Sequence, residues 1–71
     1  MSTLLITSEG EQAVMAMEAK GPDYAVLAML YELKGPVDFD EIVNKLRTDE
    51  VKASLLVRRL IGQGYIEESG G

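Results

Sequence analysis

The segment 37–68 places the strongest constraint on the fold of this chain. Its first half has apolar residues at i, i+3, i+4 and i+7, which is the spacing of one helical face. These residues are Phe39, Ile42, Val43 and Leu46. Asp38, with a glutamate three residues later, has the spacing of a capping box at a helix start. We therefore expect an amphipathic helix over residues 39–47.

A second helix follows almost at once. Thr48 is its expected N-cap, and the acidic residues that come next suit the positive end of a helix dipole. The helix is expected over residues 49–63, with a core face made of Ala53, Leu56, Val57 and Leu60. A cap at Thr48 directly after a helix that ends near Arg47 leaves a turn of about three residues. The two helices are therefore expected to form a helix-turn-helix.

The first part of the chain predicts a strand and a helix. Residues 3–7 (TLLIT) are β-branched and aliphatic, which is typical of a strand. Ser8 is followed three residues later by a glutamate, so it is the expected cap of a helix over residues 9–20. Gly21 and Pro22 are expected to end this helix, because glycine suits a left-handed C-cap and proline cannot continue a helix.

A third helix is expected over residues 24–34, with Asp23 as its N-cap and Gly35-Pro36 at its end. Its sequence, YAVLAMLYELK, is apolar almost all round. A helix without a polar face is central to a small core, or presents one face to a second copy of the chain. Both interpretations stay open at this point.

The C-terminal part predicts a short strand over residues 65–68, which follows the glycines at 62 and 64. This strand and the one over 3–7 could form a small sheet that joins the two ends of the chain. The sequence therefore predicts one domain over residues 1–71 that is mainly α. It would contain four helices, of which the last two form a winged helix-turn-helix. A minimal one- or two-stranded β element would complete the domain.

Composition limits how such a domain is stabilised. A chain of 71 residues buries only about 60% of the surface that its unfolded form exposes, so its core is thin. The chain has no cysteine and no histidine, which removes disulfides and the usual ligands of structural zinc. Association with a second copy or a larger partner is the remaining route.

Charge is distributed unevenly along the chain, whose net charge is −5. Residues 44–63 carry five basic and two acidic residues, a net charge of +3, whereas the rest carries −8. Basic charge therefore collects on the helix-turn-helix, either as a nucleic-acid surface or as ordinary solvated helix faces.

Membrane association and catalysis are not expected. No apolar stretch approaches the roughly 20 residues of a membrane span, and no signal peptide is recognisable, so a cytoplasmic location is expected. Without histidine or cysteine, the usual general base and strong nucleophiles of enzymes are missing. Acidic pairs such as Asp49-Glu50 could hold a hard cation, but helix capping explains them more simply. Neither a metal nor another cofactor is expected.

The stretch VRRLIGQGYIEE resembles the end of the recognition helix in winged-helix transcription regulators of the MarR and ArsR type. Those proteins commonly have a basic residue, a core leucine, three variable residues, a glycine and two apolar residues that open the wing. The matching residues are Arg59, Leu60, Ile61-Gly62-Gln63, Gly64 and Tyr65-Ile66. The preceding FDEIVNKL is similar to the first motif helix of that family. The resemblance spans residues 37–68 and implies a winged-helix fold and DNA binding.

Two features depart from that family. The sequence predicts only one wing strand, so the second strand and the basic wing tip of that family are not expected in residues 1–71. The outward face of the second helix carries Val51 and Leu55, where the family places polar or basic groups. An apolar side chain can contact a thymine methyl group but offers no hydrogen bond to a base edge.

The leading interpretation is a small regulator that binds double-stranded DNA. The residues expected to contact DNA are Lys45, Arg47, Lys52, Ser54, Arg58 and Arg59, with Lys45 and Arg47 contacting phosphates. Each could instead be a solvated surface residue, and Ser54 could face the first motif helix. The alternative is a protein-interaction or homodimerisation module that does not bind DNA, with Val51 and Leu55 at its interface.

Overall fold

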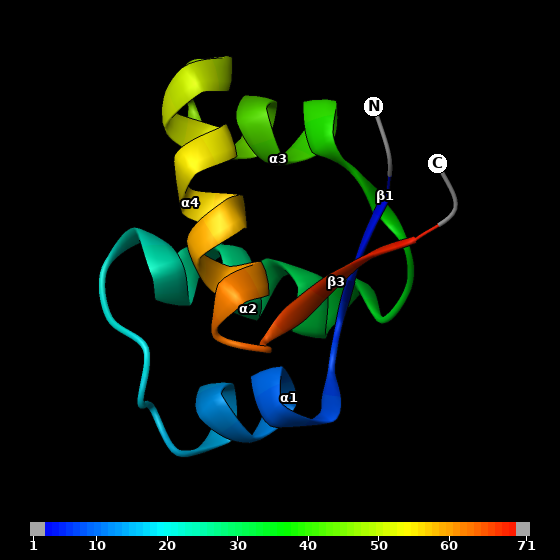
Figure 1. Ribbon diagram of the computed structural model, residues 1–71, viewed down its shortest axis with the longest axis vertical. Helices are drawn as coiled ribbons and strands as arrows, with labels where there is room; N and C mark the ends of the chain where they lie inside the picture. Colours follow the sequence, from blue (N-terminus) through cyan, green and yellow to red (C-terminus); the bar gives the residue numbers. More distant parts are fainter. Residues whose placement is uncertain (1–2, 70–71) are drawn as a thin grey trace.

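Four helices and a small antiparallel sheet make up the part of the chain that the computed structural model describes, residues 3–69 (Figure 1). The elements are β1 (Thr3–Ile6), α1 (Ser8–Met15), α2 (Pro22–Leu33), β2 (Val37–Asp38), α3 (Phe39–Leu46), α4 (Glu50–Gly62) and β3 (Ile66–Ser69). The predicted fold class, mainly α with a minimal β element, is confirmed. None of these helices is long and apolar enough to cross a membrane.

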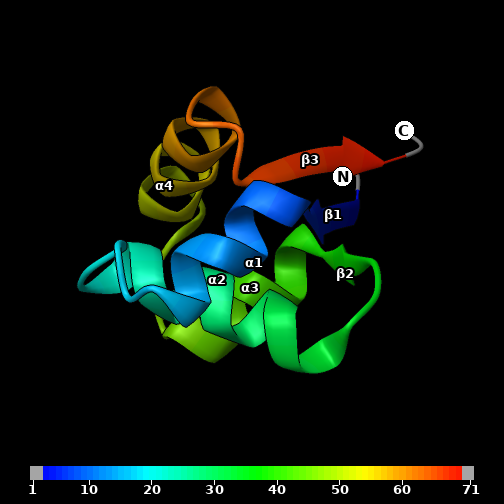
Figure 2. The same cartoon turned by 90° about the horizontal axis from the view of Figure 1, so that it is seen from below.

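The sheet brings both ends of the described chain together in the order β2-β1-β3. β1 lies in the centre and pairs antiparallel with both neighbours, with Leu4 opposite Val37 on one side and Glu68 on the other. The expected pairing of the N-terminal and C-terminal strands is therefore confirmed. β2 adds one strand more than predicted, because the buried side chain of Val37 holds this short segment beside β1. Figures 1 and 2 show the strands along one edge of the molecule, with the helices beside them.

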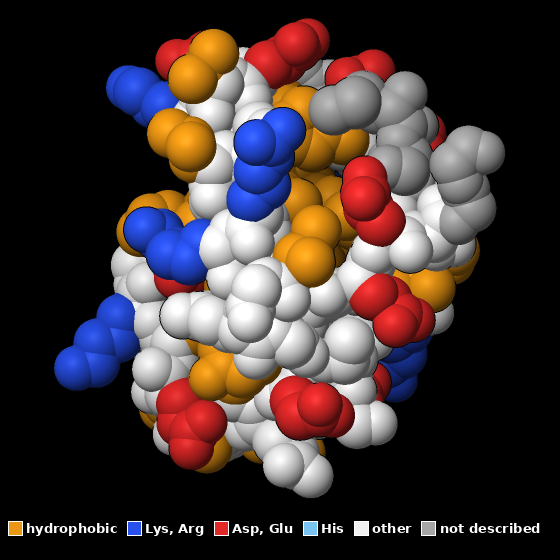
Figure 3. Space-filling view, in the orientation of Figure 1, with side chains coloured by type: hydrophobic (Ala, Val, Ile, Leu, Met, Phe, Trp, Pro, Cys, Tyr) orange, Lys and Arg blue, Asp and Glu red, His pale blue; other side chains and the backbone are white. Residues whose placement is uncertain are grey.

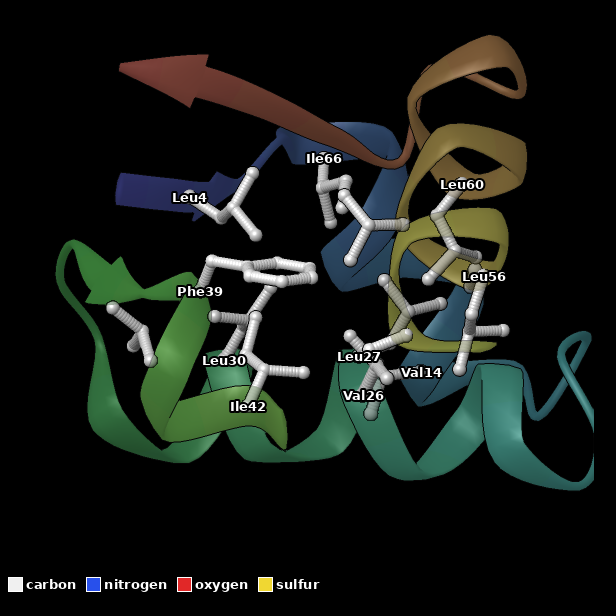
Figure 4. Close-up of a cluster of buried hydrophobic side chains, with 14 residues drawn as sticks. Leu4, Val14, Val26, Leu27, Leu30, Phe39, Ile42, Leu56, Leu60 and Ile66 are labelled. Atoms are coloured by element: carbon white, nitrogen blue, oxygen red, sulfur yellow. The ribbon is translucent and has the colours of Figure 1, made fainter. Parts of the chain in front are cut away.

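One apolar core joins every element (Figure 4). Helix α2 contributes Val26, Leu27 and Leu30, all with 0% of their surface exposed, so its predicted central position is confirmed. The predicted core face of α4 is also buried: Ala53, Leu56, Val57 and Leu60 are at most 8% exposed. Figure 4 shows these side chains meeting those of the sheet and α3 in a single cluster.

Helix α1 is shorter than the predicted 9–20, because it ends at Met15. Met17 takes a left-handed conformation (φ 56°) and donates its N–H to the carbonyl of Val14, and the N–H of Glu18 donates to the carbonyl of Ala13. This pair of bonds is a Schellman motif, which ends a helix without a glycine or proline. Gly21 therefore does not end α1; it precedes α2 as its N-cap residue.

The predicted start of α1 and both predicted ends of α2 are wrong by one or two residues. Helix α1 is capped by Thr7, not Ser8, since the Thr7 hydroxyl accepts a hydrogen bond from the N–H of Gly10 at 3.0 Å. Helix α2 begins at Pro22, one residue before the predicted cap Asp23. Its end is set by Lys34, which takes the left-handed position (φ 53°) ahead of the predicted stop at 35–36.

Candidate functional site

Local hydrogen bonds fix the helix-turn-helix on each side of its three-residue turn. Helix α3 ends in a second Schellman motif, in which Arg47 is left-handed (φ 53°) and Thr48 donates its N–H to the carbonyl of Val43. Helix α4 is capped by Asp49, whose carboxylate accepts the N–H of Lys52 at 2.8 Å. The predicted cap, Thr48, is therefore wrong, because Asp49 occupies that position. Because the backbone is fixed on both sides of the turn, the position from which the Arg47 side chain projects is also fixed.

The outward face of α4 is apolar, as the helical spacing predicts. Val51 is 70% exposed and Leu55 is 65% exposed, which are high values for large aliphatic side chains. In Figure 3, hydrophobic and basic side chains alternate over α4, whereas acidic side chains lie mainly around it. The exposed surface of α4 therefore combines an apolar stripe, Val51 and Leu55, with flanking positive charge.

The basic residues lie on both sides of this stripe. On the side of α2, an open groove of about 410 Å³ is bordered by Arg47, Lys52 and Arg59, and its apolar lining includes Leu46 and Leu55. On the side of α3 and the sheet, Arg58 borders two adjoining hollows of about 360 and 270 Å³. Lys45, Arg47, Lys52 and Arg58 are all exposed. The structure thus brings the predicted basic residues together on one helix-turn-helix.

Arg59 differs from the other basic residues because it is held by the scaffold. Its guanidinium donates to the carboxylate of Asp23 at 2.6 Å, across 36 positions of sequence. The Arg59 side chain remains 57% exposed and that of Asp23 is 19% exposed, so the pair stabilises the fold only weakly. Arg59 therefore joins α4 to the first turn of α2, a role that local sequence patterns could not indicate.

Ser54 lies beside the first motif helix. It is half-buried and lines both hollows next to Phe39, the first residue of α3. Its position matches the alternative in which it faces that helix, and it does not share the outward face with Val51 and Leu55. Phe39 itself is 4% exposed and forms part of the floor of these hollows.

The strand that follows α4 pairs with the N-terminal strand and not with a neighbouring strand in a wing hairpin. β3 follows α4 and pairs with β1, so residues 3–69 contain no hairpin after α4. The residues exposed on β3 are Glu67 and Glu68, which are acidic. Residues 3–69 therefore contain no basic wing tip, which is the departure from the family that the sequence predicts.

Acidic side chains form no metal site within the described range. No group of three or more Asp or Glu residues there could hold a metal ion. Asp49 serves as a helix cap, and Glu50 lies in the first turn of α4, where negative charge is favourable.

Comparison with protein-family models, with curated proteins and with solved structures finds no match for this chain.

Proposed function

We propose that the helix-turn-helix binds double-stranded DNA, mainly through the phosphate backbone. The observation that carries this proposal is a set of exposed basic side chains around α4 that form no ion pair within residues 3–69. They are Lys45, Arg47, Lys52 and Arg58. Arg59 is excluded from this set because Asp23 already binds its guanidinium.

The arrangement suits a helix placed in the major groove. Phosphates of the two DNA strands border this groove, and an α-helix fits between them. Lys52 and Arg58 lie on opposite sides of the Val51 and Leu55 stripe, since they border different grooves of the protein. Each can thus reach a different strand, while Lys45 and Arg47 extend the contact along one of them.

Base readout should be weak. The two most outward side chains of α4, Val51 and Leu55, cannot form hydrogen bonds and can at most contact thymine methyl groups. Arg58 is the one basic residue beside them that could reach guanine from the same face. We therefore expect little discrimination among DNA sequences, with most of the affinity coming from released counterions.

Salt dependence tests this proposal. Four phosphate contacts predict a log–log slope of about −3.6, so affinity should fall about 150-fold between about 50 and 200 mM salt. Lys52→Ala and Arg58→Ala should each reduce the steepness of the slope by about 0.9. Lys20→Ala is the matched control, because Lys20 is also exposed but lies outside the helix-turn-helix. A slope near zero, or no binding of any duplex at low salt, would refute DNA binding.

A second function, binding of an acidic protein segment, is favoured by the apolar character of the same face. Val51 and Leu55 are about two-thirds exposed. Leu55 adjoins a groove whose charged residues are all basic, and both residues adjoin a hollow that Arg58 and Glu50 border. An amphipathic helix with acidic flanks has the complementary chemistry. Leu55→Lys separates the two functions. It adds a cation and should strengthen DNA binding, whereas it should abolish binding of an acidic amphipathic helical peptide.

A further inference from the structure

The outer face of α2 is unusually apolar for a helix face that is exposed or half-buried in the described structure. The inner face of this helix supplies core residues, and its outer face carries Ala25, Ala28, Met29, Glu32 and Leu33. Leu33 is 49% exposed, and Glu32 is the one charged residue on this face. A helix that faces water normally has a largely charged or polar outer face. This composition matches the seam that the sequence left open as an alternative for this helix.

A shallow groove runs between this face and the end of α3. Its volume is about 290 Å³, and its lining consists of Ala25, Met29, Glu32, Leu33, Lys45 and Leu46. The floor is apolar, and the two charged groups have opposite sign and come from different helices. Neither Glu32 nor Lys45 forms an ion pair within residues 3–69. The groove therefore offers an unpaired acid and an unpaired base beside an apolar surface.

We propose that the outer face of α2 and this groove bind a second copy of the same chain in a two-fold symmetric dimer. In a two-fold interface, if one residue contacts a second residue of the other copy, the reverse contact also forms. In the protein without DNA, where Lys45 has no phosphate to contact, Glu32 of each copy would then meet Lys45 of the other, which forms two equivalent ion pairs. Leu33 and Met29 would lie on the apolar floor of the opposite groove, and the alanines would allow the helices to approach closely.

Charge identifies the occupant as a second copy. A strongly acidic partner would be opposed by Glu32, and a strongly basic partner would be opposed by Lys45. A surface with one group of each sign is complementary to itself when it is rotated by two-fold symmetry. The exposed Ala25 and Leu33 are removed from water by the same contact.

The size of the surface predicts a weak dimer. A standard interface buries about 800 Å² per partner, roughly a sixth of the 4578 Å² surface of this molecule. One face of the 12-residue α2, about 18 Å long and about 10 Å wide, is smaller than that. Association should therefore be reversible and strongly dependent on concentration, as for other small interfaces.

Sedimentation equilibrium of the protein alone, without DNA, tests the proposal. The average mass should rise from 7.8 kDa toward twice that value as concentration increases to about 1 mM. Glu32→Lys and Lys45→Glu should each weaken association at least about tenfold, because each places like charges in contact twice. The double variant Glu32→Lys/Lys45→Glu should restore it, since both ion pairs re-form with reversed sign.

Controls separate this interface from general charge effects. Glu11→Lys and Lys20→Glu make the same charge changes on exposed residues away from the groove, and they should leave association unchanged. Leu33→Glu should give a monomer with an unchanged circular dichroism spectrum. A wild-type protein that stays monomeric at about 1 mM would overturn the proposal. So would a double variant that associates no better than the two single ones.

Discussion

Gly10→Ala is the substitution for which the structure and helix propensity predict opposite results. Gly10 lies in the first turn of α1, and alanine is more favourable than glycine in a helix by about 1 kcal/mol. However, Gly10 is buried against the chain that enters β3. A Cβ atom there would overlap the backbone oxygen of Tyr65 and would lie 2.7 Å from Cγ1 of Ile6. The backbone oxygen cannot move unless the segment around Tyr65 moves with it.

The close approach of Gly10 to Tyr65 lies beside two hydrogen bonds that join Thr7 to residues 64–65. A shift of Tyr65 would therefore weaken them. Thr7 donates its N–H to the Tyr65 carbonyl at 2.9 Å and its hydroxyl to the Gly64 carbonyl at 2.6 Å. Overpacking costs about 1–3 kcal/mol, and each weakened hydrogen bond costs about 1 kcal/mol. After the gain in helix propensity, we expect Gly10→Ala to destabilise the fold by about 3 kcal/mol.

Thermal unfolding followed by circular dichroism measures this effect. A loss of about 3 kcal/mol should lower Tm by more than about 10 °C in a domain of this size. Gly62→Ala is the matched control, because Gly62 is also helical and an alanine methyl group there would meet no atom within 4 Å beyond its own helix and chain neighbours. It should leave Tm unchanged or raise it by a few degrees, because alanine is more favourable than glycine in a helix by up to about 1 kcal/mol. If Gly10→Ala also stabilised the protein, the close packing of α1 on residues 64–65 would be refuted.

Three further substitutions test the core, the turn and the ion pair. Leu60→Ala removes a side chain that is 0% exposed and should cost about 2–5 kcal/mol in urea unfolding; a loss below about 1 kcal/mol would contradict the assigned core face. Arg47→Gly should stabilise the fold by about 0.5–1 kcal/mol, because glycine tolerates the left-handed conformation, yet it should weaken DNA binding. A destabilised Arg47→Gly would contradict the turn geometry. Asp23→Asn should release the Arg59 guanidinium and steepen the salt slope of DNA binding by about 0.9, at a cost of no more than about 1 kcal/mol; an unchanged slope would show that Arg59 stays away from DNA.

Periodicity predicts the helices and their buried faces well. The apolar spacing in α3 and α4 identifies residues such as Ile42 and Leu60, because burial of one helical face is a local property of the sequence. The same spacing places Val51 and Leu55 opposite the core, and both are exposed. Pairing of the terminal strands could also be expected, since few other segments have strand character.

Helix ends are harder to predict than helix faces. Hydrogen bonds determine where each helix ends, and the residues at these positions are not of the types that usually mark an end. Met17, Lys34 and Arg47 occupy left-handed positions that glycine or asparagine usually take, so the chain gives no local signal for them. At the starts of α1 and α4, neighbouring residues can both serve as caps, and the geometry selects Thr7 over Ser8 and Asp49 over Thr48.

Contacts between distant segments could not be read from the sequence at all. The ion pair of Arg59 with Asp23 joins positions in two different helices, and it occupies the guanidinium of one residue that the sequence predicts to contact DNA. The packing of Gly10 on Tyr65 likewise depends on how α1 meets the chain before β3. No periodic pattern encodes either contact, because each arises from the tertiary arrangement.

The most direct test of DNA binding by the helix-turn-helix is a chemical-shift titration of the protein with a mixed-sequence duplex at several salt concentrations. The proposal predicts shifts confined to residues 44–63 and a log–log salt slope of about −3 to −4. The shifts should leave α1 and the sheet unaffected, because those elements carry exposed acidic residues and no basic residue. Absence of shifts in residues 44–63 at low salt, or a slope near zero, would contradict the proposal.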